Sequence, residues 1–471
     1  MTAGRTIDLG ELLETRALGR FHFLVATLGF LALMIDGLDN NAATVSAPSI
    51  LRAFGENRAA MGHVFGAGST GALIGSFVFG YVSDRWGRRI GIISSVLCYC
   101  LPTLFSAWAT SLDQLLVLRF LGGMGVAGVV PNTIAFLTET APRRYRASFV
   151  MLTLIGIAAG NSTAGQVAAW LIPSYGWPIV FEVGGAVGVA LSVLLYFTLP
   201  QSIRYLAVRK PDGAELRRLV ARLAPDLDIP ADARFFLHQP KREGAALRQL
   251  FAGEQRIATP LLWIGYFAEA LTFMTLLSWM SVFLTTAGLT QTQAAFAFSY
   301  AAMGGICAIL IMSRLLDRFG PAALVVSAVS AIVFVSLMGT PGLSHNVLVL
   351  MAILGVAFCT CTHNALNGTV GLFYPTAIRG KGVGYATGMG RLGLIVGPVV
   401  TGALLSAKLP LQDVLYVVAA PYLVVACTCG ALGRLYQRRF VAGAGIEAAP
   451  SEPAPIAADP MTAPQSMGST R

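Results

Sequence analysis

Long apolar stretches constrain the fold of this chain more than any other feature. About twelve of them, each roughly twenty residues long, recur along the 471 residues, and each can cross the ~30 Å hydrocarbon core of a bilayer as a helix. Only 12% of the residues are charged, against about 25% in a soluble domain. The pattern predicts an all-α integral membrane protein and excludes a β-barrel, whose strands are about ten residues of alternating polarity.

A polar, basic segment divides these stretches into two groups of six. The stretches lie at roughly 21–41, 61–82, 90–109, 113–137, 148–172, 177–199, 258–286, 293–314, 321–340, 346–368, 383–407 and 413–435. We therefore expect a cytoplasmic N-terminus (1–20), an N-terminal six-helix bundle (21–199), a cytoplasmic central loop (200–257), a C-terminal six-helix bundle (258–435) and a disordered cytoplasmic tail (436–471). Within the loop, "AELRRLVARL" (214–223) predicts a short amphipathic helix.

The distribution of basic residues predicts the topology. The Lys and Arg residues lie on the amino-terminal side of the membrane, except for Arg52, Arg58 and Lys408 on the opposite side and Arg119 and Arg391 within spans. Positive charge marks the cytoplasmic face, so we expect both termini in the cytoplasm of a bacterial-type inner membrane. The net charge of +10 is therefore a topology signal, and we expect a lipid bilayer and no nucleic acid as a partner.

An internal repeat supports two equivalent halves. "DRWG" (84–87) returns as "DRFG" (317–320), and the same offset relates Asp36 to Glu269 and Arg146 to Arg379. Repeats of this kind place a substrate site between the halves, near the membrane midplane. We therefore predict a cavity between the two bundles.

Two acids inside the first span are the main candidates for proton coupling. Asp36 and Asp39 follow an apolar run in "MIDGLDNNAATV" (34–45). A charge at the bilayer centre costs ~2.5–3.5 kcal/mol on insertion scales, so such acids are usually functional. Residues three apart share a helix face, so we expect Asp36, Asp39 and Asn40 to face one cavity. Glu269, the repeat equivalent of Asp36, is a third candidate.

Other polar residues within the spans are candidates for substrate binding. Arg391 lies in "GYATGMGRLGLIVGP" (384–398), and its guanidinium can bind a carboxylate through two parallel hydrogen bonds. The alternative is an arginine that only pairs with an internal acid. Further candidates are Asn40, Asn132, His363 and Asn364, and Phe30, Trp279 and Phe283 can supply aromatic walls.

Charged residues of the cytoplasmic loops predict a gate. "GYVSDRWGRR" (80–89) joins the second and third spans, "ETAPRRYR" (139–146) follows the fourth, and "LPQSIRYL" (199–206) follows the sixth. The alternative is a set of loops that only mark the positive inside face. The candidate gating residues are Asp84, Arg85, Arg88, Arg119, Glu139, Arg146, Asp317 and Arg379.

Two further patterns have a structural explanation. "GMGVAG" (123–128) fits a dinucleotide fingerprint, but that fingerprint requires a preceding strand and a helix N-terminus. Here the glycines lie within an apolar helix, so we expect close helix packing. The seven cysteines all fall in spans as well. Cys-x-Cys pairs on a helix point to different faces, so we expect no metal, no disulfide framework and no cofactor.

Four segments together resemble one family. "DGLDNNAATVSAP", "RFLGGMGVAGVVPN", "LFYPTAIRGKGVGYATGMGRLGLIVGP" and the loop at 80–89 are similar to the aromatic acid:proton symporters of the major facilitator superfamily. The resemblance implies a twelve-helix fold of two pseudo-symmetric halves that imports aromatic carboxylates, such as hydroxybenzoates, with protons. It implies that Asp36 and Asp39 are needed for transport, and that Arg391 either binds the substrate or takes part in coupling transport to protons. In the first span, Asn40 and Thr44 replace the Leu and Gly that are usual in the motif of this family.

Three alternatives to aromatic acid import are an exporter, a carrier of sugars or other metabolites and a membrane enzyme, and a purely sensory role is a further one. An exporter of the same superfamily often carries Gly-x-x-x-Gly-Pro in the fifth span, where this chain has "GIAAGN" (156–161). A proton-coupled carrier of sugars or other metabolites has the same fold. A sensor would bind ligand without net flux. The five histidines are scattered and form no catalytic motif, so we expect no enzyme, and we expect a functional monomer.

Overall fold

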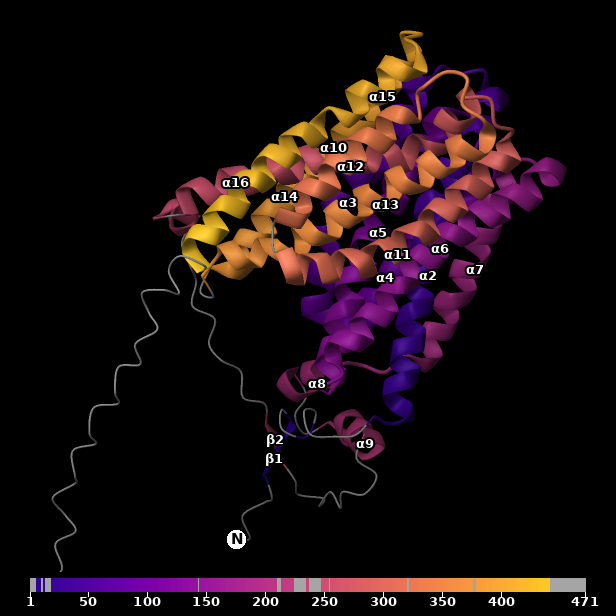
Figure 1. Cartoon of the computed structure of the whole chain (residues 1–471). Helices are drawn as coiled ribbons and strands as arrows, with labels where there is room; N and C mark the ends of the chain where they lie inside the picture. The colour runs from indigo at the N-terminus through magenta and orange to yellow at the C-terminus, as the bar shows by residue number, and fades with distance from the viewer. Residues whose placement is uncertain are drawn as a thin grey trace, which may run out of the picture.

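The computed structural model describes residues 6–9, 12, 18–142, 144–209, 213–223, 234–236, 247–253, 255–319, 322–375 and 378–440. The first half consists of α2 (Arg20–Phe54), α3 (Arg58–Trp86), α4 (Arg88–Ser106), α5 (Leu112–Thr140), α6 (Arg146–Tyr175) and α7 (Pro178–Thr198). The second half consists of α10 (Gln255–Thr286), α11 (Gln291–Phe319), α12 (Ala322–Leu337), α13 (His345–Thr369), η2 (Val370–Phe373), α14 (Arg379–Ser406), α15 (Leu411–Ala419) and α16 (Pro421–Phe440). Figure 1 shows the two halves side by side.

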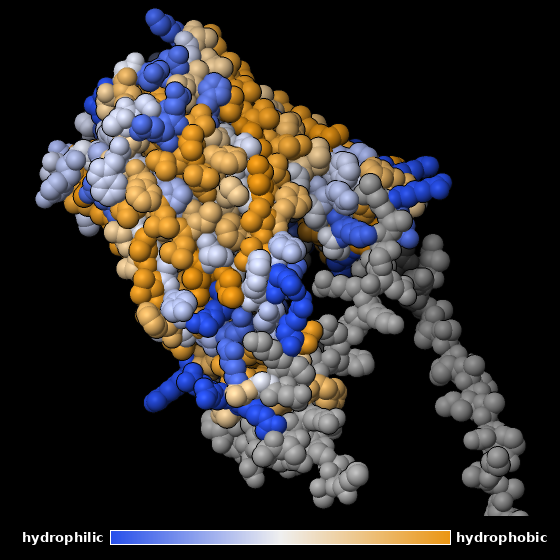
Figure 2. Space-filling model, turned by 180° about the vertical axis from the view of Figure 1, so that it is seen from behind, coloured by the Kyte–Doolittle hydropathy of each residue, from blue (hydrophilic) through white to orange (hydrophobic). Residues whose placement is uncertain are grey.

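The helices have the length and composition of membrane spans. Eleven of the described segments are long and apolar enough to cross a bilayer, with α15 and α16 counted as one segment. The shorter apolar helix α12 occupies the place of the remaining predicted span. Figure 2 shows a broad apolar band across the visible face of the molecule, with hydrophilic residues toward its ends. Large apolar side chains of the spans are exposed, such as Phe77 of α3 at 74% and Phe197 of α7 at 78%, as expected where lipid replaces water. The predicted all-α membrane fold is confirmed.

Glycine allows the closest helix contacts within the first half. A Cβ at Gly123 of α5 would overlap the carbonyl oxygen of Gly68 in α3, and a Cβ at Gly71 of α3 would overlap that of Phe120 in α5. Small residues of this kind let helix backbones approach each other in a membrane. The packing interpretation of the glycine motif is therefore confirmed.

The two halves are closed against each other at one end. Helix α2 packs on α10, α3 on α14, and α6 on α11. Ser49 donates a hydrogen bond to Gln291 at 2.5 Å, and Arg58 donates to Thr286 at 3.2 Å. One hydrophobic core crosses between the halves at this end and includes Phe65 and Trp279, whose rings meet edge to face. The polar contacts join the carboxyl end of α2 to the amino end of α11, and the carboxyl end of α10 to the amino end of α3.

The opposite ends of the halves, from which the chain enters α2 and leaves α16, are separate. There the first half has its own hydrophobic core, which includes Val25, Phe136 and Leu195 and no described residue of the second half. Figure 1 shows the end of the first half near α8 (Ile203–Arg209) apart from the end of α16. The bundle is thus closed at one end and splayed at the other.

A small unit lies beside the splayed end of the first half. It contains β1 (Thr6–Asp8), α8, α9 (Ala214–Leu223) and β2 (Arg234–Phe236), and β1 pairs with β2 in parallel. Helix α9 is the predicted amphipathic helix, and its apolar residues pack on α8 and β2. The segment η1 (Leu247–Phe251) then leads into α10. Helix α16 continues to Phe440, and the rest of the predicted tail, 441–471, lies outside the described residues.

Candidate functional site

A cavity of about 900 Å³ lies between the two halves. This is within the usual range for sites that hold small organic molecules. Its walls come from α2, α3 and α5 on one side and α10, α13 and α14 on the other. It extends toward the splayed end, where Ile134 of α5 and Val383 of α14 line it. Most of its lining is apolar and includes Phe65, Met274 and Leu394.

Asp39 anchors a buried polar cluster on the wall of the first half. Arg119 of α5 lies with its Nη1 3.7 Å from Asp39 Oδ1, and the two side chains are 8% and 2% exposed. The Thr103 hydroxyl donates to Asp39 and accepts a hydrogen bond from Arg119 Nη2 at 2.5 Å. The guanidinium also lies over the ring of Phe181, 5.3 Å from its centre. Asp39 is therefore an ion-paired acid at the cavity surface.

Asp36 differs from Asp39 in both position and partners. Asp36 is buried, its Oδ1 has no hydrogen-bond partner among the described residues, and it does not line the cavity. The expected shared face is thus found for Asp39 and Asn40, which both line the cavity, and not for Asp36. Helix α2 packs closely on α6 at Gly37, where a Cβ would overlap the Ile157 carbonyl oxygen. This contact fixes the rotation of α2 and turns Asp36 away from the cavity.

A chain of polar side chains lines the wall of the second half. His363 Nδ1 lies 3.2 Å from both carboxylate oxygens of Glu269. Asn367 Nδ2 lies 3.2 Å from His363 Nε2, and the Tyr266 hydroxyl donates to Asn367 Oδ1 at 3.0 Å. Phe273 stacks on the imidazole with ring centres 4.5 Å apart. Glu269 and His363, predicted for different roles, are thus direct partners.

Arg391 is a cavity cation without an acidic partner among the described residues. It lines the cavity from α14, and its Nη1 donates to the carbonyl oxygen of Ala72 in α3 at 3.0 Å. Asp39 is paired with Arg119, and Glu269 is paired with His363. The alternative in which Arg391 pairs with an internal acid therefore does not hold in this structure. The arrangement leaves one guanidinium able to bind an anion.

Several residues that the sequence predicts as substrate-binding groups or aromatic walls do not line the cavity. Asn132 is 4% exposed with no partner for its Nδ2 in the described part of the chain, and Asn364 donates to the Thr360 carbonyl. Trp279 and Phe283 are buried between the halves, and Phe30 is absent from the lining. Among the described residues, the aromatic rings of Phe65 and Tyr266 and the imidazole of His363 line the cavity.

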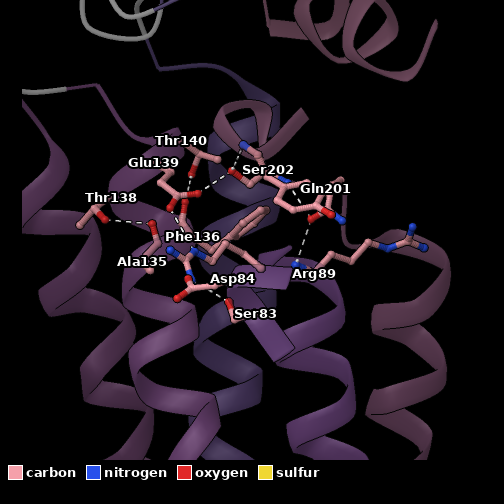
Figure 3. A network of polar contacts seen from close by, with 12 residues as sticks. Ser83, Asp84, Arg89, Ala135, Phe136, Thr138, Glu139, Thr140, Gln201 and Ser202 are labelled. Carbon is pink, nitrogen blue, oxygen red and sulfur yellow. Dashed lines mark hydrogen bonds and ion pairs between the residues drawn. The ribbon is translucent and has the colours of Figure 1, made fainter. Parts of the chain in front are cut away.

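Three of the predicted gating residues of the first half, Asp84, Arg88 and Glu139, form one network near α8. Arg88 Nε binds Glu139 at 3.1 Å, and its Nη1 binds Asp84 at 3.0 Å. The Ser202 hydroxyl donates to the other oxygen of Glu139 at 2.5 Å. Figure 3 shows how this network joins the α3–α4 turn to the end of α5 and to Gln201 and Ser202, which directly precede α8. Gln201 completes it by accepting from the Arg89 backbone N–H at 3.2 Å and donating to the Trp86 carbonyl at 3.2 Å.

The remaining gating candidates have other positions. Arg119 lies in the cavity wall with Asp39 and takes no part in this network. Arg85 is exposed, and Arg146 begins α6 with no partner for its Nε among the described residues. Arg379 begins α14 and donates to the Tyr374 carbonyl at 3.4 Å. Asp317 belongs to α11, but its side chain lies outside the described part of the chain.

Sequence reasoning missed Thr103, Tyr266 and Ser202. Tyr266 precedes Glu269 by three residues on α10, so helical periodicity indicates a shared face. Thr103 and Ser202 become relevant only through contacts with distant segments, at Asp39 and Glu139. No local pattern identifies them.

Comparison with known sequences gives a consistent result. The profile of the Major Facilitator Superfamily matches residues 29–398. The 4-hydroxybenzoate transporter PcaK of Acinetobacter baylyi is 30% identical over 416 residues, which cover 86% of this chain and 89% of that protein. A gallate transporter of Pseudomonas putida is 32% identical over 409 residues, 86% of this chain and 90% of that protein.

Solved structures show the same fold. A D-xylose-proton symporter matches with a TM-score of 0.66 at 17% identity and covers 87% of this chain and 96% of its own. A bacterial homologue of the human lysosomal transporter Spinster matches with a TM-score of 0.65 at 17% identity, covering 90% and 99%.

Proposed function

Because this chain belongs to the Major Facilitator Superfamily, we propose that it imports an aromatic carboxylate together with protons by alternating access. The relatives named above are transporters, and the chain is a multi-pass membrane transporter and not an enzyme. Beyond the transporter class, we propose the aromatic carboxylate as the substrate, the proton as the coupling ion and import as the direction. We also propose that both termini lie in the cytoplasm of a bacterial-type inner membrane.

The observation that carries the proposal is the guanidinium of Arg391, which has no acidic partner among the described residues, in a largely apolar cavity. A carboxylate on an aromatic ring matches both features, because the charged group binds the guanidinium and the ring contacts the apolar walls. A neutral sugar would leave the cation without a counter-charge. The relatives that carry 4-hydroxybenzoate and gallate support the same class.

Protons provide the driving force in this proposal. An anion that enters a cell with an inside-negative potential moves against about 2.3 kcal/mol per charge per 100 mV. One accompanying proton removes that opposition, and a second one makes the potential favourable. The proposed proton-coupling residues are Asp36, Asp39 and Glu269, all buried in the spans. In this scheme, Asp39 exchanges its contact with Arg119 for a proton during the cycle.

The two ends of the bundle take opposite roles in the cycle. With the termini in the cytoplasm, the closed end faces outward and the splayed end faces inward, so the described conformation releases substrate to the cell. The contacts of Ser49 and Arg58 with the second half form the outer closure. The network around Glu139 and Arg88 is the proposed inner gate of the first half.

Competition in proteoliposomes tests the substrate class. Purified protein would be reconstituted with an inward proton gradient, and uptake of labelled 4-hydroxybenzoate would be measured against unlabelled competitors. We expect benzoates to compete, and aliphatic acids and sugars of similar size to have no effect. Uptake that is absent, or that xylose and aliphatic acids inhibit as well as benzoates do, would contradict the proposal.

A further inference from the structure

The polar chain of the second half has one consistent hydrogen-bond direction. Tyr266 donates its hydroxyl hydrogen to Asn367 Oδ1, so Asn367 turns its Nδ2 group toward His363 Nε2. Nε2 must then accept, because an amide NH₂ can only donate. The imidazole hydrogen therefore lies on Nδ1 and points at the Glu269 carboxylate, 3.2 Å away. In this state His363 is neutral, and Glu269 accepts.

The same heavy-atom positions support the opposite direction. When Nε2 takes a proton, it becomes a donor and needs an acceptor. A half-turn of the Asn367 amide presents Oδ1 to Nε2–H and presents Nδ2 to the Tyr266 oxygen. Tyr266 then accepts where it previously donated, and its hydroxyl hydrogen is released to turn into the cavity that this residue lines.

We propose that His363 is a second proton-binding site of the transport cycle, and that the Asn367 amide reports its protonation to the substrate by turning the Tyr266 hydroxyl toward the bound anion. The inference rests on the proposed function and extends it. A hydronium ion in the cavity water transfers its proton to His363 Nε2, so that one N–H bond forms, one O–H bond breaks and water remains; the amide and hydroxyl then rotate without further covalent change.

The net charge of the Glu269 and His363 pair links proton binding to anion binding. Glu269 is 1% exposed, whereas the His363 side chain is 33% exposed and reachable from the cavity. When His363 is neutral and Glu269 is a carboxylate, the pair carries a net negative charge that repels a carboxylate in the same cavity. With protonated His363, the pair is neutral, and the chain offers an additional donor. Anion and proton therefore favour each other's binding, as thermodynamic linkage requires.

The surroundings of the pair contain few other ionisable groups. Among described residues, Tyr422 and Cys429 of α16 and Cys359 of α13 are close enough to Glu269 to interact electrostatically with it. Tyr266 faces the pair from α10, and Arg391 of α14 lines the same cavity. Across the cavity, the first half presents the ion pair of Asp39 and Arg119. Among the described lining residues of the cavity, His363 is the histidine.

Nitrogen NMR of ¹⁵N-histidine-labelled protein tests the hydrogen-bond direction without any ligand. The His363→Gln variant identifies the His363 signal, and His345→Gln is the matched control, since His345 is an exposed residue at the start of the same helix. We expect a neutral His363 that carries its hydrogen on Nδ1, and acidification to protonate Nε2. A neutral imidazole with its hydrogen on Nε2 would overturn the proposal.

Proton uptake during binding tests the coupling. A pH indicator in weakly buffered detergent solution would count protons bound when 4-hydroxybenzoate saturates the purified protein. We expect His363→Gln to bind about one proton fewer per anion than wild type, and His345→Gln to match wild type. Equal uptake by His363→Gln and wild type overturns the inference.

The Tyr266→Phe variant separates the switch from the proton site. It should still take up the His363 proton on acidification, but its affinity for the anion should lose the part of the pH dependence that His363 confers. An unchanged pH dependence contradicts the role of Tyr266. If wild type binds no aromatic acid, the proposed function fails, while the NMR measurement still decides the state of the chain.

Discussion

Asp36 and Asp39 lie three residues apart on α2 and have different chemical surroundings. Asp39 forms a buried ion pair with Arg119 and accepts from Thr103. Asp36 has no partner for its Oδ1 and no counter-charge among the described residues. Removing the charge of Asp39 leaves a buried guanidinium unpaired, whereas removing that of Asp36 leaves no cation behind. The two acids should therefore respond differently to the same substitution.

Thermal unfolding in detergent distinguishes them. We expect Asp39→Asn to lower the unfolding temperature strongly, because breaking a buried ion pair costs about 3–5 kcal/mol. Asp36→Asn should lower it less. The double variant Asp39→Asn Arg119→Gln should recover part of the loss, because it removes the unpaired charge as well. Equal effects of the two single variants, with no recovery in the double variant, would argue against the ion pair.

Arg391 provides a second prediction at this scale. Arg391→Lys keeps the positive charge but loses the planar pair of donors that binds a carboxylate. One charge-assisted hydrogen bond is worth about 1.5–3 kcal/mol, so we expect the KM for 4-hydroxybenzoate uptake to rise about ten- to a hundredfold. Arg434→Lys is the control, since Arg434 is exposed on α16 and does not line the cavity. An unchanged KM in Arg391→Lys would exclude direct carboxylate binding by this residue.

At the scale of helices, glycine determines how closely α3 and α5 pack. A Cβ at Gly123 would overlap the backbone of Gly68, whereas a Cβ at Gly80 of α3 meets no described atom within 4 Å. Gly123→Ala forces two backbones apart, and Gly80→Ala only exchanges a weak helix former for a strong one. The two substitutions are chemically identical and differ only in their neighbours.

We expect Gly123→Ala to destabilise the protein by about 1–3 kcal/mol or more, the usual effect of overpacking. Gly80→Ala should leave the stability unchanged or raise it slightly. Unfolding temperatures in detergent give the comparison. A Gly123→Ala protein as stable as wild type would mean that α3 and α5 are not in backbone contact.

The sequence predicts the helices far better than their rotation. Each span is visible because it needs about twenty apolar residues, and the glycines of α5 indicate close packing on their own. The facing of α2 depends instead on its contact with α6 at Gly37, which no local pattern encodes. For the same reason, the sequence predicts Arg119 at the gate, although α5 presents it to Asp39. Long-range partners such as Thr103 follow only from the fold.

At the scale of the whole molecule, the closed end of the bundle, which is the proposed outer closure, consists of a few polar contacts over an apolar core. Gln291 of α11 accepts from both Ser49 and Arg52 of α2. Without this acceptor, two donors lose their partner across the interface, and the outward-open state should gain population. The cavity residue Ser69 would then become reachable from outside.

Thiol labelling measures this change. Ser69→Cys would be labelled from outside with a membrane-impermeant reagent, and the protein without this substitution provides the background from its own cysteines. We expect an added Gln291→Ala substitution to speed labelling severalfold. Gln412→Ala is the control, because Gln412 bonds to Tyr416 of its own helix. If Gln291→Ala left the labelling rate unchanged, this contact would not be what holds the outer closure.

Substrate-driven proton movement tests the central claim most directly. Proteoliposomes with the purified protein and no initial pH gradient would receive external 4-hydroxybenzoate, and a pH indicator would follow the outer medium. Coupled import predicts that the medium becomes alkaline at a rate proportional to uptake of the labelled acid, and that Asp36→Asn abolishes this change. If the purified wild-type protein took up the labelled acid while the pH of the outer medium stayed constant, proton-coupled import would be contradicted.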